Sequence, residues 1–282
     1  MKLLLLIGCS LFRRETTDQF DMALDAADEL YARRDDPQRL EEAIDAYVLM
    51  LASAPREPRV LLRLSRAFTA RAETLPGEDQ RKELELARGY GLECLSVNPG
   101  FASRRDLGGG RVTPQAARFL TAADAPCLAS TLYAWVRWAE QRGAAAAVDL
   151  PALRALSDRA SALPTGWVGP WSQGMLILIA PGPVEHDLIA SRESLELSIL
   201  LAPGRATAHA DLVRWQLVHE EDVAAFEREV ANFSQSWPEL SDGEWALENR
   251  VARGRVAALA GDWEHLAYEA WVQTKEKGPE GP

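Results

Sequence analysis

The stretch AIDAYVLMLASAP, residues 43–55, decides the fold, because its pattern returns twice more along the chain. Counted from its first residue, a small side chain stands at offset 0, a variable one at offset 4 and a compact one at offset 7, and a proline stands at offset 12. The same offsets recur in ARGYGLECLSVNP at residues 87–99 and in SRESLELSILLAP at residues 191–203, with a weaker copy at residues 152–164. The positions concerned are Ala43, Tyr47, Met50 and Pro55; Ala87, Gly91, Cys94 and Pro99; Ser191, Leu195, Ser198 and Pro203; and Ala152, Leu156, Arg159 and Pro164. Small residues let paired helices approach closely, and a proline closes each unit because it cannot continue a helix. This spacing predicts helical hairpins of the tetratricopeptide-repeat (TPR) type.

Helical periodicity extends outward from these units over most of the chain. Apolar residues recur at three- and four-residue steps from Asp18 onward, and proline or glycine punctuates them. We expect a helix from residue 18 to the break at 35–37 and a second one from Pro37 with an apolar stripe through Leu51. Further helices are expected at residues 59–74, 79–97, 114–122, 123–143, 149–163, 167–180, 185–201, 206–218, 222–236 and 241–260. The pattern lapses at residues 101–113, which contain three consecutive glycines, so we expect a long connection there. No segment sustains a period of two. The predicted fold class is therefore all-α, with TPR-like helical-hairpin repeats forming a compact superhelical array; the alternative is plain antiparallel helices without a superhelix.

Composition and charge narrow the class of protein. The chain has 282 residues, of which 47% are hydrophobic and 26% charged, as in ordinary globular proteins. Its formal net charge of -11 argues against a nucleic-acid partner, which needs a concentrated basic surface. The longest internal apolar run, residues 175–180, is far shorter than the ~20 residues of a membrane-spanning helix.

The N-terminus has the features of a bacterial lipoprotein signal. Met1 and Lys2 precede a leucine run, and LIGC at residues 6–9 resembles a lipobox in which Cys9 is acylated after cleavage. We therefore expect a short signal peptide at residues 1–8, a linker at 9–17, a TPR-like helical domain at 18–274 and a disordered tail at 275–282. Ser10 after the cysteine is compatible with outer-membrane sorting. The alternative is that this stretch is the first element of a cytosolic protein, with Cys9 as an ordinary thiol.

No residue cluster indicates catalysis or metal binding. The three cysteines lack zinc spacing; Cys94 and Cys127 either pair in an oxidising compartment or are buried thiols, and both readings stay open. The four histidines are scattered, and acidic neighbours such as those of His186 and His219 are explained as helix-terminal residues. Residues 170–174, PWSQG, have proline at the first position, where a nucleophile elbow requires glycine, and no strand is predicted before them. We expect no enzyme activity, no metal and no cofactor.

Aromatic residues provide the candidate ligand-binding side chains. Tryptophan accounts for 9 residues, and several of them cluster. Trp135 and Trp138 are three apart and share one helical face. The candidates for lining a pocket or a pore are Tyr133, Trp135, Trp138, Trp167 and Trp171. The alternative is that these rings only pack helix pairs together.

Several segments together resemble the T-component (TatT) family of TRAP transporter accessory proteins. The matching segments are LYAW at 132–135 with Trp138, Ala139 and Gly143; residues 191–203; EED at 220–222 followed by Phe226 and Glu227; LENRVA at 247–252; and NPGF at 98–101. The resemblance implies an all-helical, TPR-like periplasmic lipoprotein that assembles as a homotrimer around a central pore. It also implies docking to the solute-binding subunit of a TRAP system and binding or passage of small hydrophobic or organic-acid ligands. The competing function is a cytoplasmic TPR scaffold that grips a partner protein.

Overall fold

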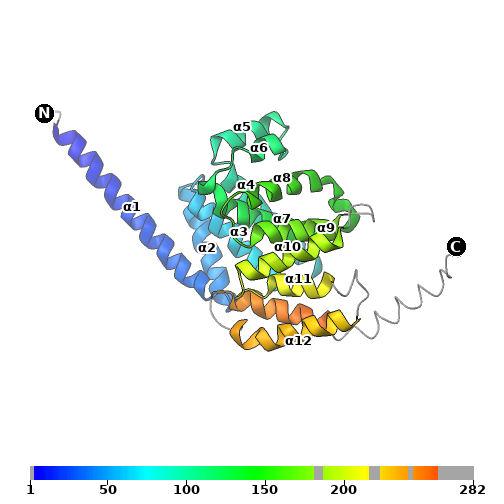
Figure 1. Ribbon diagram of the computed structural model, residues 1–282. Helices are drawn as coiled ribbons and strands as arrows, with labels where there is room; N and C mark the ends of the chain where they lie inside the picture. Colours follow the sequence, from blue (N-terminus) through cyan, green and yellow to red (C-terminus); the bar gives the residue numbers. More distant parts are fainter. Residues whose placement is uncertain (1–2, 181–186, 216–222, 241–243, 260–282) are drawn as a thin grey trace. The chain divides into compact units, whose positions relative to one another are not determined.

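The computed structural model describes residues 3–180, 187–215, 223–240 and 244–259, and within these ranges it contains helices and turns but no strand (Figure 1). The α-helices are α1 (Leu3–Ala32), α2 (Pro37–Ser53), α3 (Pro58–Glu73), α4 (Gly77–Leu95), α5 (Pro99–Leu107), α6 (Pro114–Ala117), α7 (Ala125–Glu140), α8 (Leu150–Ser161), α9 (Val168–Ile179), α10 (Leu188–Leu201), α11 (Thr207–Trp215) and α12 (Val223–Leu240). Short 3-10 helices span η1 (Ala122–Asp124) and η2 (Gly143–Val148), and residues 246–259 form a further α-helix. The all-α prediction is confirmed for the described part of the chain.

The chain divides into two compact units. The first unit consists of Met1–Arg142 with Pro151–Thr165, and the second of Gly143–Leu150 with Gly166–Pro282. The single helical domain expected at residues 18–274 thus spans both units. Each unit is described by itself below.

Proline residues begin several of the helices, and a polar residue caps each of them. Pro37, Pro58, Pro99 and Pro114 occupy the first positions of α2, α3, α5 and α6. The residue before each proline accepts a hydrogen bond from a free backbone N–H of the first turn, as Asn98 does from Gly100 and Phe101. Proline at the first helical position loses no hydrogen bond, because its missing N–H would have no partner inside the helix. This local chemistry fixes where the helices start.

The core of the first unit is built around α7. This helix packs against both α3 and α4, and most of its residues are buried on every face. A helix that is apolar all round belongs inside a protein rather than on its surface. α3 and α4, joined by residues 74–76, also pack against each other, and α2 packs against α1 and α3. The helix that carries three of the candidate aromatic residues is therefore an internal one.

The repeated offsets are buried in all three of the stronger copies. Fully buried or nearly buried side chains stand at every first, fifth and eighth position of the pattern: Ala43, Tyr47 and Met50 in α2; Ala87, Gly91 and Cys94 in α4; and Ser191, Leu195 and Ser198 in α10. Close helix approach explains the small residues among them. A Cβ atom added to Gly91 would lie 2.5 Å from Thr131 Oγ1 in α7. The pattern read from the sequence thus marks the faces through which these helices pack.

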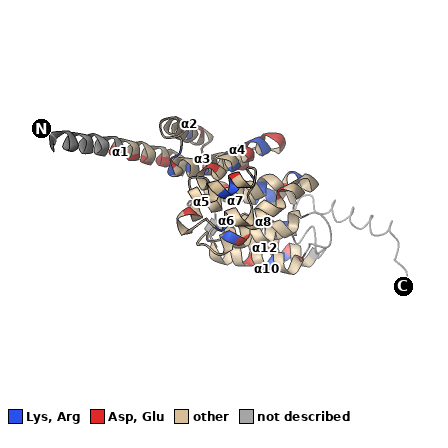
Figure 2. Cartoon of the chain, turned by 90° about the horizontal axis from the view of Figure 1, so that it is seen from above, with Lys and Arg blue, Asp and Glu red and all other residues tan. Residues whose placement is uncertain are grey.

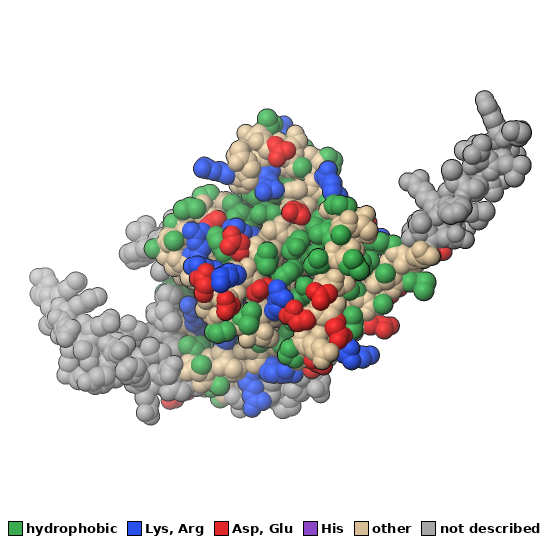
Figure 3. Space-filling model, turned by 180° about the vertical axis from the view of Figure 1, so that it is seen from behind, with side chains coloured by type: hydrophobic (Ala, Val, Ile, Leu, Met, Phe, Trp, Pro, Cys, Tyr) green, Lys and Arg blue, Asp and Glu red, His purple; other side chains and the backbone are tan. Residues whose placement is uncertain are grey.

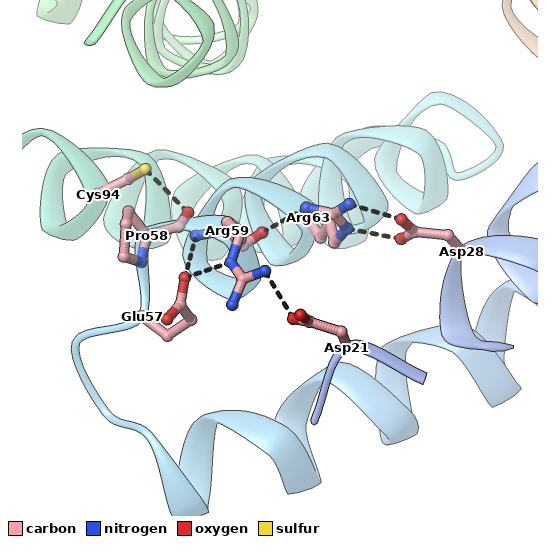
Figure 4. A network of polar contacts seen from close by, with 7 residues as sticks. All are labelled: Asp21, Asp28, Glu57, Pro58, Arg59, Arg63 and Cys94. Atoms are coloured by element: carbon pink, nitrogen blue, oxygen red, sulfur yellow. Dashed lines mark hydrogen bonds and ion pairs between the residues drawn. The ribbon is translucent and has the colours of Figure 1, made fainter. Parts of the chain in front are cut away.

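A disulfide joins α4 to α7 at the same contact. Cys94 and Cys127 are bonded, with their Cα atoms 5.8 Å apart, a separation ordinary for a disulfide. The Cys94 sulfur also lies 3.3 Å from the carbonyl oxygen of Pro58 at the start of α3 (Figure 4). Because a bonded sulfur carries no proton, we treat this as a packing contact. The pairing that the sequence left open is present.

Ion pairs attach α1 to α3. Arg63 donates two hydrogen bonds to the carboxylate of Asp28, Nε to Oδ1 at 2.6 Å and Nη2 to Oδ2 at 2.5 Å (Figure 4). Tyr47 of α2 donates to the same carboxylate at 2.7 Å. One helical turn earlier on α3, Arg59 pairs with Asp21 at 2.8 Å. A single carboxylate of α1 therefore holds α2 and α3.

Charged side chains of both signs are interspersed along the helices in Figure 2. On α4, for example, Arg81 pairs with Glu78 and Lys82 with Asp79, one turn apart. Such exposed pairs contribute little to stability and mark a solvated face.

The second unit has its own hydrophobic core. Its buried members come from α11 and the residue before it, from α12 and from the helix at residues 246–259: Ala206, Ala210, Val213, Phe226, Phe233, Ala252 and Val256. α9 packs tightly on α10, where a Cβ on Gly174 would lie 2.9 Å from the Ser191 carbonyl oxygen. Asn249 is fully buried and holds the turn after α10, because its side chain accepts from Ala206 N at 2.8 Å and donates to Gly204 O at 2.9 Å. Asn249 thus has a structural role in this unit.

Two segments differ from what the sequence predicted. α1 continues through residues 9–17, where we expected a linker; these residues contain no glycine or proline that would interrupt a helix. α5 occupies the first part of the connection expected at residues 101–113. Asn98-Pro99, which we interpreted as the stop of the preceding helix, also caps and starts the next one, and the glycine turn at residues 108–110 follows it. The predicted tail at 275–282 lies outside the described residues.

Exposed hydrophobic side chains occur beside charged ones on the face drawn in Figure 3. Over the described part of the chain, the most exposed large hydrophobic side chains are those of Met22, Leu49, Leu107, Val148, Ile189 and Leu200. None of the described helices has the length and apolar content that crossing a bilayer requires.

Candidate functional site

Two of the predicted aromatic residues, Trp135 and Trp138, come together around arginine side chains in the first unit. The guanidinium carbon of Arg88, on α4, lies 4.0 Å from the ring centroid of Trp138 and 5.4 Å from that of Trp135. Arg142, just beyond the end of α7, lies 4.4 Å from the Trp138 ring. We call these four residues, Arg88, Trp135, Trp138 and Arg142, the indole–arginine site. The shared face predicted from the three-residue spacing is thus occupied by cations.

The indole N–H groups of this site are buried without a hydrogen-bond partner. Trp135 is 6% exposed and Trp138 8% exposed, and neither Nε1 has an acceptor among the described residues. A buried donor left without an acceptor costs about 1–3 kcal/mol, so native proteins rarely leave two of them side by side. The Nε1–H groups of Trp135 and Trp138 are therefore two buried donors that lack an acceptor.

Tyr133 serves a different contact from its two neighbours. Its hydroxyl donates to Glu73 Oε1 of α3 at 2.7 Å, and Arg137 Nε lies 3.5 Å from the same hydroxyl. Arg137 in turn pairs with Glu140 at 3.0 Å. All of these groups are largely buried, and they form a polar network between α3 and α7. Tyr133 thus joins helices instead of facing the indole–arginine site.

Trp167 and Trp171 pack on each other in the second unit. Their ring centroids are 5.8 Å apart in an edge-to-face arrangement. Trp171 is fully buried and donates its Nε1–H to Asp211 Oδ2 at 2.7 Å. The guanidinium of Arg205 lies 4.0 Å from the Trp167 ring and 4.3 Å from the Trp245 ring. Both tryptophans thus have their contacts inside the second unit, which favours a packing role for them.

The arginines of both aromatic clusters were missed from the sequence. Arg88 follows the first position of a repeat copy, Ala87, and nothing in the sequence alone shows that α4 lies against the tryptophan face of α7. Arg205 and Trp245 are far apart in the chain and meet only in the fold. An arginine next to a repeat position can be predicted to contact the tryptophans only when it is known which helix packs against it.

Titratable groups elsewhere show shifts that belong to packing. Burial lowers the pKa of His209, whose ring packs edge-on against Phe233. Burial raises the pKa of Asp28, but hydrogen bonds from Arg63 and Tyr47 outweigh it, so the net pKa lies below the usual value. Among the described residues no cluster of three or more His, Cys, Asp or Glu side chains is placed to hold a metal ion. The acidic and histidine residues weighed in the sequence, 185–186 and 219–222, lie outside the described residues, and the side chain of Cys9 is not described.

We compared the chain with known protein families and with curated proteins. No protein-family model matches the chain, and a search of curated proteins finds no significant match.

Proposed function

We propose that this chain is a non-enzymatic binding protein of the bacterial envelope, built from TPR-like helical hairpins and acting as an accessory of a TRAP-type transport system. In this role it binds or passes small hydrophobic or organic-acid ligands and docks to the solute-binding subunit, as a homotrimer. The observation that supports the proposal is the burial of the same three offsets in α2, α4 and α10, which is the burial expected where helical hairpins pack closely.

The cysteines support the envelope location. A disulfide between Cys94 and Cys127 persists in oxidising compartments and is rare in the reducing cytosol. The lipobox-like residues 6–9 supply Cys9 as an acylation site, which would anchor the protein to the outer membrane through lipid. Both features favour the periplasm over the cytoplasmic scaffold.

The indole–arginine site supports the ligand-binding part. Aromatic rings with polar N–H groups, beside cations, suit a small ligand that is apolar at one end and polar at the other. Trp167 and Trp171 contribute less to this proposal, since Trp171 already has a buried partner in Asp211.

The test combines lipid labelling with partner capture. Cells expressing the tagged chain are grown with an alkyne-bearing palmitate, and the Cys9→Ser variant is the control. We expect label on the parent chain alone, and a TRAP solute-binding subunit among the proteins cross-linked to it in intact cells. An unlabelled chain that fractionates with cytosolic proteins would contradict the proposal and favour the scaffold.

A further inference from the structure

We propose that residues 99–121 of the first unit form a membrane-contact surface that binds the anionic phospholipid headgroups of a bilayer. This segment, which we call the arginine lobe, comprises α5, the glycine turn at residues 108–110, α6 and the residues that adjoin them. The inference goes beyond the proposed function, in which only the lipid on Cys9 contacts a membrane, and it does not depend on acylation of Cys9.

The arginine lobe is basic although the chain as a whole is acidic. Residues 99–121 contain four arginines and one aspartate, Asp106, which gives a formal charge of +3, whereas the whole chain carries -11. The arginines are Arg104, Arg105, Arg111 and Arg118. Blue side chains accordingly lie on the part of the molecule that α5 and α6 form at the top of Figures 1 and 3. The lobe is thus a local positive surface on a negative protein.

The positive charge of the lobe is not neutralised by carboxylates of the described part of the chain. Arg105 donates to neutral oxygens, from Nε to the Gly110 carbonyl at 2.9 Å and from Nη1 to Ser96 Oγ at 3.1 Å. None of the four arginines has an ion pair within the described ranges, and the side chains of Arg111 and Arg118 are exposed. The lobe can therefore offer its charge to an anion outside the chain.

Two large apolar side chains are exposed among these arginines. Leu107, next to the glycine turn, is 77% exposed, and Phe119 is 44% exposed. The guanidinium carbon of Arg104 lies 5.6 Å from the Phe119 ring centroid. α5 packs mainly on α6, and the interior of the lobe is already filled by the buried side chains of Phe101, Val112 and Leu120. Leu107 and Phe119 thus add apolar surface to a basic face.

The combination of guanidinium groups and apolar side chains suits the interface of an anionic bilayer. A guanidinium binds phosphate oxygens through parallel hydrogen bonds, and leucine and phenylalanine enter the boundary of the acyl chains. Charge and apolar surface alternate over a short distance at Arg104 and Phe119, which a fluid interface accommodates without a partner of matching shape. An acidic protein is the alternative partner, because it would also neutralise the charge.

The experiment measures sedimentation of the full chain with lipid vesicles. The Cys9→Ser chain is used, so that no acyl group contributes to binding. The vesicles contain either phosphatidylcholine alone or equal parts of phosphatidylcholine and phosphatidylglycerol. We expect stronger binding to the anionic vesicles despite the net charge of -11, and a decrease of this binding as salt is added. The leucine run at residues 3–6 is the same in every variant, so differences between variants report on the lobe.

Matched arginine variants test the charge of the lobe. Each basic residue at an anionic membrane surface strengthens binding about fivefold. The double variant Arg111→Gln and Arg118→Gln should therefore weaken binding to anionic vesicles by about tenfold or more. The control, Arg33→Gln with Arg66→Gln, removes two exposed arginines outside the lobe and should leave binding nearly unchanged.

A matched leucine pair tests the apolar contact. Leu107→Ser should weaken binding to anionic vesicles by about fivefold or more, because the side chain no longer enters the acyl boundary. Leu49→Ser is the control, since Leu49 on α2 is 75% exposed and lies outside the lobe. Circular dichroism melting checks that all four variants are folded.

Three results would overturn the inference. Equal sedimentation with neutral and anionic vesicles would mean that the arginines do not recognise headgroup charge. Equal weakening by the lobe variants and their controls would mean that the lobe is not the contact surface. Absence of binding to anionic vesicles at low salt would leave an acidic protein as the partner. Because these measurements use the Cys9→Ser chain, each result is independent of the lipid labelling and partner capture that test the proposed function.

Discussion

Asp28 accepts hydrogen bonds from two different helices, so its protonation should matter to folding. Because its pKa is lowered in the folded chain, its contribution to stability is complete above the ordinary value of 3.8 and is lost as the pH falls below that value toward the folded pKa. Asp28→Asn keeps an acceptor oxygen for Tyr47 but removes the charge opposite Arg63. The pair is part-exposed and screened, so we expect a loss on the order of 1 kcal/mol at neutral pH.

Urea unfolding at pH 7 and pH 3 measures this effect. The variant and the parent chain should differ at pH 7, and the difference should narrow at pH 3, which lies below the ordinary pKa of 3.8 that the carboxyl group has in the unfolded chain. Asp45→Asn, an exposed carboxylate in α2, is the control and should show no such narrowing. A difference that persists unchanged at pH 3 would show that the charge is not responsible.

Asn249 makes a second prediction at the scale of one residue. Its side chain is the partner of the buried Ala206 N–H and of the Gly204 carbonyl, so Asn249→Ala leaves a buried donor unsatisfied. We expect a loss of about 1–3 kcal/mol in the free energy of unfolding. Hydrogen exchange at the Ala206 amide should quicken in the variant more than at amides of the first unit. Uniform quickening over the whole chain would contradict a local role.

At the scale of the helices, the approach of α4 to α7 depends on the absence of a side chain at Gly91. An added Cβ would lie 2.5 Å from Thr131 Oγ1 and 2.9 Å from Thr131 Cα, and the backbone atom cannot move aside alone. Gly91→Ala should therefore destabilise the chain by about 1–3 kcal/mol despite the better helix propensity of alanine.

Gly89 in the same helix provides the matched control. Nothing lies within 4 Å of a Cβ at this position. Gly89→Ala should stabilise the chain by about 0.5–1 kcal/mol through helix propensity alone. Thermal unfolding of the two variants side by side gives the answer. Equal shifts for both would mean that α4 and α7 are not in close contact.

The helices could be predicted from the sequence more readily than the site. Proline and polar caps stand next to each other at Asp36-Pro37 and Glu57-Pro58, and such local signals place helix starts without knowledge of the fold. The offsets of Gly91 and Ser191 also carried packing information that the buried faces confirm. The helix boundary at Asn98-Pro99 was harder to predict, because α4 ends shortly before these residues and α5 starts at them.

The arginines of the indole–arginine site could not be predicted in the same way. The face shared by Trp135 and Trp138 follows from helix geometry, whereas the approach of Arg88 depends on which helix lies opposite. The same limit applies to Trp171, whose partner Asp211 is 40 residues away. Long-range partners are fixed by the tertiary fold, which a single sequence does not show.

At the scale of the molecule, the disulfide connects α4 to α7 in the interior of the first unit. Cys94 and Cys127 are separated by 33 residues, so their bond restricts a substantial loop of the unfolded chain. Replacing both cysteines with alanine should lower the stability by about 2–4 kcal/mol. Melting of the parent chain in the presence of a reductant should show a fall of similar size, and no further fall in the double variant. A parent chain that ignores the reductant would contradict this prediction.

The state of the three cysteines in intact cells tests the central proposal, a lipid-anchored binding protein of the envelope, most directly. Cells are quenched in acid, and free thiols are tagged with a maleimide that adds a visible mass. The proposal predicts no tag on the parent chain before reduction, since Cys9 is acylated and Cys94 is bonded to Cys127, and two tags after reduction. Three tags without any reduction would describe a reduced cytosolic protein and would contradict the proposal.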